Sequence, residues 1–342
     1  MASLVPLPVP PVVPRLAPLL DRRLLILSGK GGVGRTTVAA ALARAAAARG
    51  KRVLIAQTDA VERLGKMLGR PGPIGPVVSD VAPGIAAVNM TPKESLHQYA
   101  LMVLRYETVY RALFDNRVVR GFLSAIPGLD AYAMLGKAWW HTTEETKGAG
   151  LGGRRWTYDL VILDGPASGH ATAMLKIPRA ILEAVPAGPL ARDARIMSEL
   201  LSDPVRTALV IVTRPEELPA SETVELAATA RDTLKIPLGP VIVNAVPAGR
   251  VNAEPVSSAL DRLRGIDDER LGRTVALATG QRAQRRTAEA VLTSLEKNPG
   301  LPLVTLPWLP STALGLAEID RLASGLAASP AIVGQGPAAS PA

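Results

Sequence analysis

The chain contains no cysteine, and this absence excludes several kinds of site. Without thiols there is no disulfide framework, no zinc site built on thiolates and no thiolate site for a metalloid. The three histidines are not spaced as metal ligands, so we do not expect a zinc role for them. A chain without cysteine is compatible with a reducing cytosol, and we expect a cytoplasmic protein.

Aromatic residues are also scarce, at 3% of a chain that is 48% hydrophobic. The core must therefore rest on Ala, Val, Leu and Ile, as in many α/β proteins. No apolar run reaches the roughly 18 residues that span a membrane, so no transmembrane segment is expected. Residues 1–21 are apolar but rich in proline and lack a basic start, which predicts a disordered lead-in and not a signal peptide. Residues 329–342 read as a disordered tail.

The formal net charge of +9 is scattered along the chain and forms no block of five or more like charges. A basic balance suits acidic partners such as nucleic acid or an anionic membrane surface. Scattered charge instead favours a generally arginine-rich composition. Nucleic acid is therefore an unlikely partner.

Residues 24–37 read LLILSGKGGVGRTT, a buried-strand run followed by a glycine-rich turn and a helix start. The frame Gly29-x-x-x-x-Gly34-Arg35-Thr36 is that of a phosphate-binding loop, except that Arg35 stands where lysine is expected. Backbone amides there can surround a polyphosphate, and the Thr36 hydroxyl can bind Mg²⁺. The alternative is a glycine-rich turn without a ligand. The residues expected to contact nucleotide are Gly29, Lys30, Gly31, Gly32, Val33, Gly34, Arg35, Thr36 and Thr37.

The exchange of lysine for Arg35 bears on catalysis. Lysine is a slim point charge that reaches the β- and γ-phosphates, whereas arginine is a wide planar fork. The swap preserves charge while changing geometry, so nucleotide binding is favoured over fast hydrolysis.

Two acidic residues follow predicted strands. Asp164, in TYDLVILDGPASGH, ends a strand at the edge where open α/β sheets bind ligands, which predicts a Mg²⁺ contact through water. Its alternative role is to cap the next turn. Asp59, in QTDAVERL, can orient or deprotonate an attacking water, or act as the N-cap of a helix from Ala60 onward.

Apolar runs alternate with helical stretches from residue 24 to residue 326, which predicts an α/β fold with a doubly wound, mostly parallel sheet. We expect one P-loop domain over residues 22–328, with an inserted helical subdomain at about 92–147. The insertion's larger apolar side chains either line a groove for a client or form a small core of their own. They are Tyr99, Met102, Leu104, Tyr106, Tyr110, Phe114, Phe122, Met134, Trp139 and Trp140.

Five segments taken in order resemble the arsenite-pump ATPase family, which includes ATPases that target tail-anchored membrane proteins. They are SGKGGVGRTT, TDAVERL, LDGPASGHATAMLKIPRA, VTRPEELPASETVEL and VIVNAV. The resemblance is closest to soluble bacterial members and covers about residues 24–326. It implies ATP and Mg²⁺ as cofactors and a dimer that opens and closes with nucleotide. It also implies that Lys30 reaches the partner's nucleotide, that Asp59 activates water and that Asn244 reads adenine.

The chain also departs from the family pattern. Arg35 replaces the loop lysine, Ala60 replaces the usual proline after Asp59, and no cysteine pair is present. A nucleotide-switch ATPase that acts as a dimer, homomeric or heteromeric, on a protein or membrane-associated client is one interpretation. A catalytically weak regulatory subunit of a heterodimer with an active paralogue is another. A partitioning ATPase of the Par or Min type, which shares the altered loop, is a lesser alternative.

Overall fold

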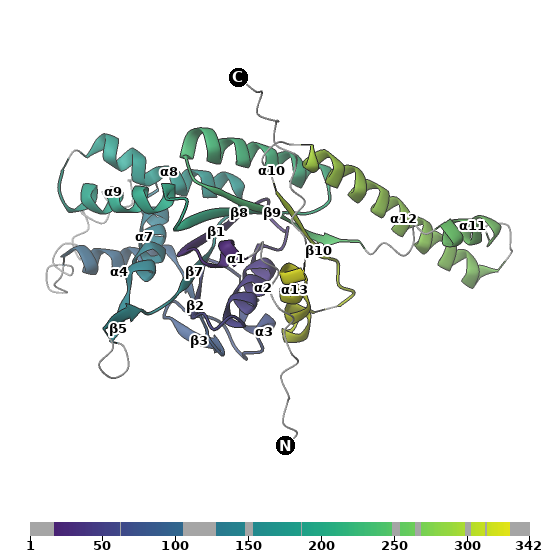
Figure 1. Ribbon diagram of the computed structural model, residues 1–342, viewed down its shortest axis with the longest axis horizontal. Helices are drawn as coiled ribbons and strands as arrows, with labels where there is room; N and C mark the ends of the chain where they lie inside the picture. Colours follow the sequence, from purple (N-terminus) through teal and green to yellow (C-terminus); the bar gives the residue numbers. More distant parts are fainter. Residues whose placement is uncertain are drawn as a thin grey trace, which may run out of the picture.

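An eight-stranded sheet forms the centre of the computed structural model (Figure 1), and its strand order is β10-β9-β8-β1-β7-β2-β4-β3. All neighbouring strands are parallel except β3 and β4. The strands are β1 (Leu24–Ser28), β2 (Val53–Thr58), β3 (Ser79–Ala82), β4 (Ile85–Met90), β7 (Leu160–Asp164), β8 (Thr207–Thr213), β9 (Leu238–Val246) and β10 (Leu303–Pro307). The structure thus confirms the predicted doubly wound, mostly parallel α/β fold.

The structure describes residues 17–61, 63–104, 128–147, 153–185, 187–247, 254–263, 268–297, 302–311 and 313–328. The expected tail and most of the expected lead-in lie outside these ranges. So do residues 105–127 of the predicted insertion.

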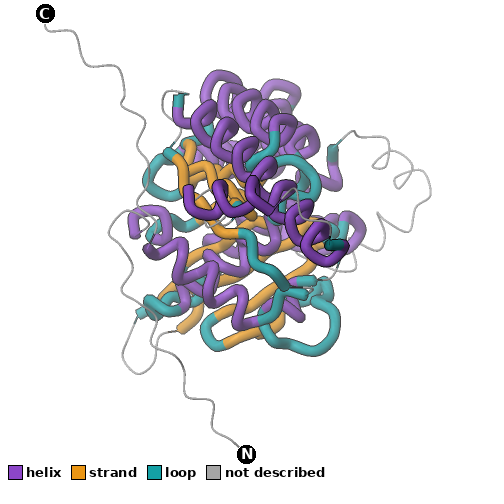
Figure 2. The backbone as a smooth tube through the Cα atoms, turned by 90° about the vertical axis from the view of Figure 1, so that its right-hand side faces the viewer, coloured by secondary structure: helices purple, strands orange, loops and turns teal. Residues whose placement is uncertain are grey.

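Helices cover both faces of the sheet (Figures 1 and 2). One face carries α2 (Arg35–Ala47), α3 (Leu64–Met67) and α13 (Leu316–Ala328). The other carries α7 (Leu129–Thr143), α8 (Ser168–Ala184), α9 (Pro189–Ser202), α10 (Glu217–Thr229) and part of α12 (Glu269–Glu296). The remaining helical elements are α1 (Ala17–Leu20), α4 (Pro92–Leu104), α11 (Glu254–Leu263) and the π-helix η1 (Ala230–Leu234).

Strand β1 explains why the strands read as continuous apolar runs. Leu25 and Leu27 pack into the cluster with α2 and α13, whereas Leu24 and Ile26 pack into the cluster on the other face. Alternate side chains of a strand point to opposite faces, so a strand covered on both sides needs apolar residues throughout. Strand β1 is therefore held by buried side chains on both faces of the sheet.

Helix α2 is almost entirely buried, and its sequence suits that position. Its small alanines let it lie close to the sheet, and alanine has the best intrinsic helix propensity. The chain leaves the helix through Gly50, whose φ of 80° is a conformation that glycine adopts readily. Burial along most of its length packs α2 against the sheet, with its N-terminus following the loop from β1.

The structure adds strands that the sequence did not predict. Between β2 and α4, the segment SDVAPGIAAVNM forms β3 and β4, joined by a turn at Pro83 and Gly84. Its alanines and short length gave no strand pattern of the usual branched type. Residues 145–147 belong to β5 (Glu145–Lys147), which pairs with β6 (Arg154–Trp156) and is not helical as the insertion was expected to be.

Helix α7 carries some of the insertion's expected side chains, namely Met134, Trp139 and Trp140. Met134 and Trp139 are partly buried and pack against the main core beneath α7. Trp140 is 40% exposed. The expected side chains at 99, 102, 104, 106, 110, 114 and 122 lie outside those that the structure describes.

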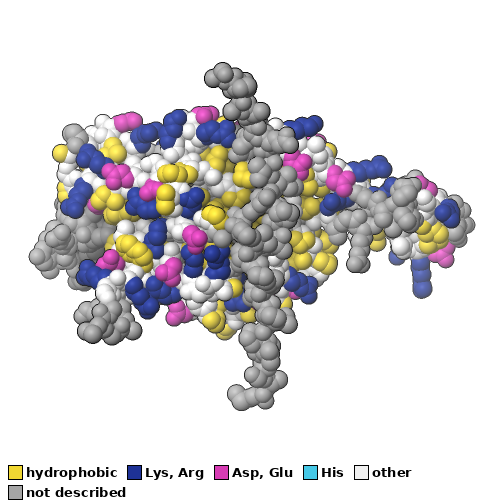
Figure 3. All heavy atoms as spheres, in the orientation of Figure 1, with side chains coloured by type: hydrophobic (Ala, Val, Ile, Leu, Met, Phe, Trp, Pro, Cys, Tyr) yellow, Lys and Arg dark blue, Asp and Glu magenta, His cyan; other side chains and the backbone are white. Residues whose placement is uncertain are grey.

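Figure 1 shows α11 and the far half of α12 projecting from the body of the molecule as an arm. On the face in Figure 3, basic and acidic side chains are interspersed over the body. Among the described residues, no helix combines the length and the apolar character needed to cross a bilayer.

Candidate phosphate-binding site

The loop between β1 and α2 has the backbone shape that surrounds an anion. Gly32 and Gly34 have φ values of 85° and 91°, a left-handed conformation that glycine adopts without strain. Gly34 is the N-cap of α2, and no side chain caps it. The first N–H groups of a helix have no partner within the helix, so they are available to a phosphate.

Two glycines of the loop are required by close packing. A Cβ atom on Gly29 would lie 2.0 Å from the carbonyl oxygen of Val212 in β8. A Cβ atom on Gly34 would lie 2.3 Å from Nδ2 of Asn244, which donates a hydrogen bond of 2.9 Å to the Val33 carbonyl. Asn244, at the carboxyl end of β9, therefore holds the loop from the side in this conformation.

Arg35 folds back onto its own loop. Its Nη1 atom donates to the carbonyl oxygens of Gly29 at 2.7 Å and Lys30 at 2.9 Å. Its Nε atom is buried and has no partner among the described residues. Burial lowers the pKa of Arg35, and the nearby Asp164 carboxylate acts in the opposite direction. Burial removes part of the hydration of the guanidinium, so its position at the loop costs free energy.

Three side chains meet at the carboxyl edge of the sheet: Asp164 at the end of β7, Gln57 near the end of β2 and Thr36 in the first turn of α2. The Thr36 hydroxyl donates to Oδ2 of Asp164 at 2.7 Å, and Nε2 of Gln57 donates to the same oxygen at 3.3 Å. The two residues predicted to hold Mg²⁺ are therefore in contact, although they are 128 positions apart. The sequence did not predict Gln57 as a member of this group, because it reads as one more residue of a buried strand.

This group of side chains fits a hydrated Mg²⁺. Oε1 of Gln57 is buried and has no partner among the described residues, so it can accept a hydrogen bond from a metal-bound water. Asp164 is 5% exposed, and burial raises its pKa despite the hydrogen bonds from Thr36 and Gln57 and the charge of Arg35. A bound cation would favour the ionised carboxylate. Mg²⁺ usually takes few protein ligands beside phosphates and waters, so a hydroxyl and one carboxylate are sufficient protein groups for it.

Asp59 lies at the same edge, after β2, on an exposed loop. Its φ of 45° is uncommon for a residue other than glycine. Asn89 at the end of β4 fixes the next residue, because its Oδ1 accepts from Ala60 N at 3.0 Å and its Nδ2 donates to Ala60 O at 2.9 Å. The alternative role of Asp59 as a helix N-cap is wrong, since the next helix, α3, begins at Leu64 with Arg63 at its N-cap.

Lys30 points away from its own loop and toward α10. Its ammonium forms an ion pair with Oε1 of Glu222, and Oε2 of the same carboxylate accepts a 3.0 Å hydrogen bond from the Ser168 hydroxyl. The backbone N–H of Ser168 donates to Gly29 O at 3.1 Å. Neither Ser168 nor Glu222 was singled out from the sequence, because a single serine at a helix start and an acid on a helix carry no pattern of their own.

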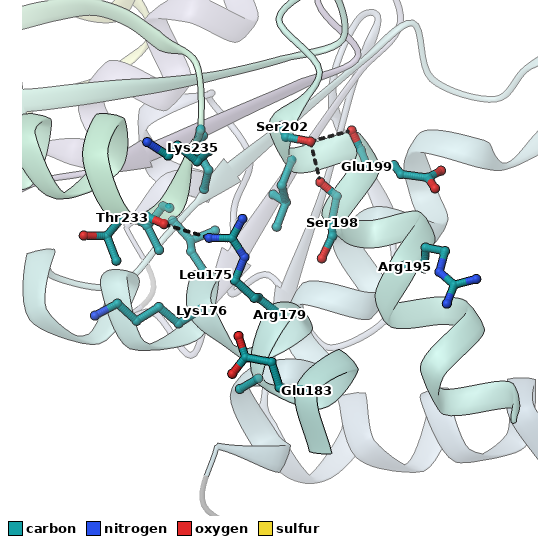
Figure 4. Close-up of a pocket in the computed structure, with 14 residues that line it drawn as sticks. Leu175, Lys176, Arg179, Glu183, Arg195, Ser198, Glu199, Ser202, Thr233 and Lys235 are labelled. Carbon is teal, nitrogen blue, oxygen red and sulfur yellow. Dashed lines mark hydrogen bonds between the residues drawn. The ribbon is translucent and has the colours of Figure 1, made fainter. Parts of the chain in front are cut away.

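A separate cavity of about 480 Å³ lies between α8, α9 and η1, away from the phosphate loop (Figure 4). Arg179 in it donates to Thr233 O at 3.0 Å. Lys176 and Arg195 extend to different sides, and Glu183 is among the lining residues. The cations do not converge on one point, so this cavity is not a second phosphate site.

Comparison with known proteins agrees with this geometry. Residues 22–186 match the model of a family described as anion-transporting ATPases. This segment includes the phosphate loop, Asp59 and Asp164.

The chain is also similar to named proteins. It is 25% identical over 323 residues to the ATPase BagA of Mycobacterium tuberculosis strain H37Rv, covering 89% of this chain and 92% of that protein. It is 27% identical over 318 residues to an arsenical pump-driving ATPase of Escherichia coli, covering 88% of this chain and 48% of the pump protein. It is 31% identical over 230 residues to the corresponding ATPase of Acidiphilium multivorum, covering 63% of this chain and 37% of that protein. This chain thus spans about half the length of the Escherichia coli relative.

Proposed function

Because this chain belongs to the anion-transporting, arsenite-pump type of ATPase family, we propose that it binds ATP with Mg²⁺ and acts as a nucleotide-dependent switch. The observation that supports this proposal most strongly is the contact between Thr36 and Asp164 beside the uncapped N-terminus of α2. A hydroxyl and a carboxylate for a cation thus lie next to backbone amides for phosphates. These are the components of a phosphate loop site.

In this proposal the loop amides of residues 29–37 bind the phosphates. Asn244, which is hydrogen-bonded to the Val33 carbonyl of the loop, contacts the base. Thr36 and Asp164 would hold Mg²⁺, Asp164 through water, while Gln57 orients that water. When bound, Mg²⁺ neutralises charge on the phosphates. Asp59 orients or deprotonates the water that attacks the terminal phosphate.

Titration with a fluorescent ATP analogue and Mg²⁺ tests binding directly. We expect saturable binding of the analogue, which ATP should displace. In the D164N variant, the part of this binding that depends on Mg²⁺ should be lost. A chain that gives no saturable signal with or without Mg²⁺ does not carry the proposed function.

We further propose that Arg35 weakens hydrolysis. Its guanidinium is hydrogen-bonded to two loop carbonyls and lies where a slimmer lysine would reach the phosphates. The R35K variant should release phosphate about tenfold faster or more, since one well-placed charge contributes at least that much in transition-state stabilisation. An R35K rate equal to that of the wild type would show that the arginine is not limiting.

The working form that we propose is a dimer in the cytosol, acting on a protein or membrane-associated client. In a homodimer, both hydrolysing sites would carry Arg35. The position of Arg35 favours a second candidate, a regulatory subunit that pairs with an active paralogue. Phosphate release measured alone and with a paralogue that keeps the loop lysine separates the two. Stimulation only in the mixture supports the heterodimer, and a full rate from this chain alone supports the homodimer.

A further inference from the structure

The Lys30 ammonium is engaged within its own chain by two elements of the fold. Glu222, on the second turn of α10, receives Lys30 on one oxygen and the Ser168 hydroxyl on the other. Ser168 is the first residue of α8 and follows directly on the loop from Asp164. One carboxylate therefore joins the phosphate loop to the segment that follows the proposed Mg²⁺ ligand.

We propose that Glu222 is a positioning residue that holds Lys30 in the resting state and releases it when the loop after Asp164 rearranges on nucleotide binding. This inference rests on the proposed function, since release is tied to ATP and Mg²⁺. The contact between Lys30 and Glu222 can be tested in nucleotide-free protein, separately from the release step.

The strength of the contact suits a reversible clamp. The side chains of Lys30 and Glu222 are 32% and 27% exposed, so water screens the pair and the bond contributes little to folding. The pKa of Glu222 is lowered most by the hydrogen bond from Lys30 and less by the one from Ser168. This keeps the carboxylate charged at neutral pH. A phosphate with a higher charge density can compete for the ammonium.

Ser168 provides the link to the nucleotide. Its backbone N–H is bonded to Gly29 O and its hydroxyl to Glu222, so a shift of the start of α8 would strain both bonds together. A γ-phosphate and Mg²⁺ that draw Asp164 toward the nucleotide would pull on this segment, because only three residues separate Asp164 from Ser168. Glu222 would lose one of its two partners, and Lys30 would be freed.

The first experiment uses nucleotide-free protein and measures the rate at which an amine-reactive acylating reagent modifies Lys30, followed by mass spectrometry. In E222Q, Lys30 should react about threefold faster than in wild type. A change of this size corresponds to the loss of one partly exposed ion pair. E225Q is the matched control, because Glu225 lies on the same helix and is exposed. Equal Lys30 rates in E222Q and E225Q, with equal melting temperatures, would overturn the clamp.

The second experiment measures self-association with ATP and Mg²⁺ by light scattering, with ATP affinity recorded in parallel. E222Q should associate at a protein concentration about threefold lower than E225Q, and it should bind ATP up to about threefold more tightly, because nucleotide binding no longer has to break the Lys30–Glu222 pair. In a K30M background, E222Q should have no effect, since the clamp acts through Lys30. A gain that persists in K30M overturns the inference. Failure of wild type to bind ATP overturns the proposed function and the release step, but leaves the labelling difference as a measure of the resting contact.

Discussion

Two aspartates bracket strand β7, and their surroundings differ sharply. Asp159, just before the strand, faces Arg52, whose backbone N–H and guanidinium donate to its oxygens at 2.8 Å, 3.3 Å and 3.1 Å. Burial alone would raise the pKa of Asp159, but the hydrogen bonds and charge of Arg52, with a smaller effect of Arg23, lower it. The nearby Arg23 also donates to the carbonyls of Tyr158 and Asp159 and lies over the Trp156 ring.

Asp164, at the other end of β7, is more deeply buried and has no direct ion-pair partner within the described residues. Its pKa is raised by that burial. The neighbouring atoms Gln57 Oε1 and Arg35 Nε are also buried, and neither has a partner among the described residues. Polar groups left in this state cost free energy until a ligand completes them.

The two ends of β7 therefore differ in what their polar groups contact. At the amino end, Asp159 is paired with Arg52. At the carboxyl end, Gln57 and Arg35 beside Asp164 are only partly satisfied by the described residues. A ligand that completes these groups would make the carboxyl end the functional one.

The largest effect that we expect would come from G29A, which tests how tightly the carboxyl edge is packed. The new Cβ would meet Val212 O at 2.0 Å, and a φ of 151° is unfavourable for alanine. We expect a loss of about 3 kcal/mol or more in the free energy of unfolding, measured in urea. G31A is the control, since nothing lies within 4 Å of its Cβ. Equal stability of the two variants would show that the edge can relax.

D164N tests whether the partly satisfied edge exists for a ligand. Without ligand we expect the variant to be as stable as wild type or more so, because an amide avoids the cost of burying a carboxylate. With ATP and Mg²⁺ at about 100 times the dissociation constant, wild type should gain about 2.7 kcal/mol, and D164N should lose most of this gain. Strong destabilisation of ligand-free D164N would contradict the comparison.

D159N tests the opposite edge. Loss of the charged partner of Arg52 should reduce the free energy of unfolding by about 1–2 kcal/mol, the range for hydrogen bonds to charged groups after allowance for exposure. ATP binding per folded molecule should be unchanged. Chemical unfolding and nucleotide titration of the same sample measure the two quantities, and a binding defect without a stability defect would reverse the assignment.

The smallest effect that we expect is in the pH dependence of the stability of the D159N and D164N variants. The folded pKa of Asp159 is below its ordinary value of 3.8, so its contribution to stability is present above that value and is lost as pH falls through the folded pKa. The folded pKa of Asp164 is above 3.8, so its ionisation costs stability as pH rises. The advantage of wild type over D159N should shrink on acidification, whereas the advantage of D164N over wild type should grow as pH rises. Parallel pH profiles of the three proteins would contradict this.

Local pattern predicted the central elements well. The run from Leu24 to Thr37 defined a strand, a loop and a helix, because burial on two faces and a glycine frame each leave a clear trace in sequence. The edge strand β3 and its neighbour β4 were missed because their short segments lack that trace. The placement of Met134 and Trp139 was missed because helical periodicity shows that a face is buried but not which surface buries it.

The sequence alone determined that a glycine loop precedes an alanine helix and that an acid ends a strand, since these depend on residues close together in the chain. Only the tertiary structure decided that Thr36 contacts Asp164, that Arg35 binds its own loop carbonyls and that Glu222 receives Lys30. These contacts join elements far apart in sequence or depend on side-chain direction. They are set by the register of parallel strands and the packing of helices on the sheet, which no local pattern encodes.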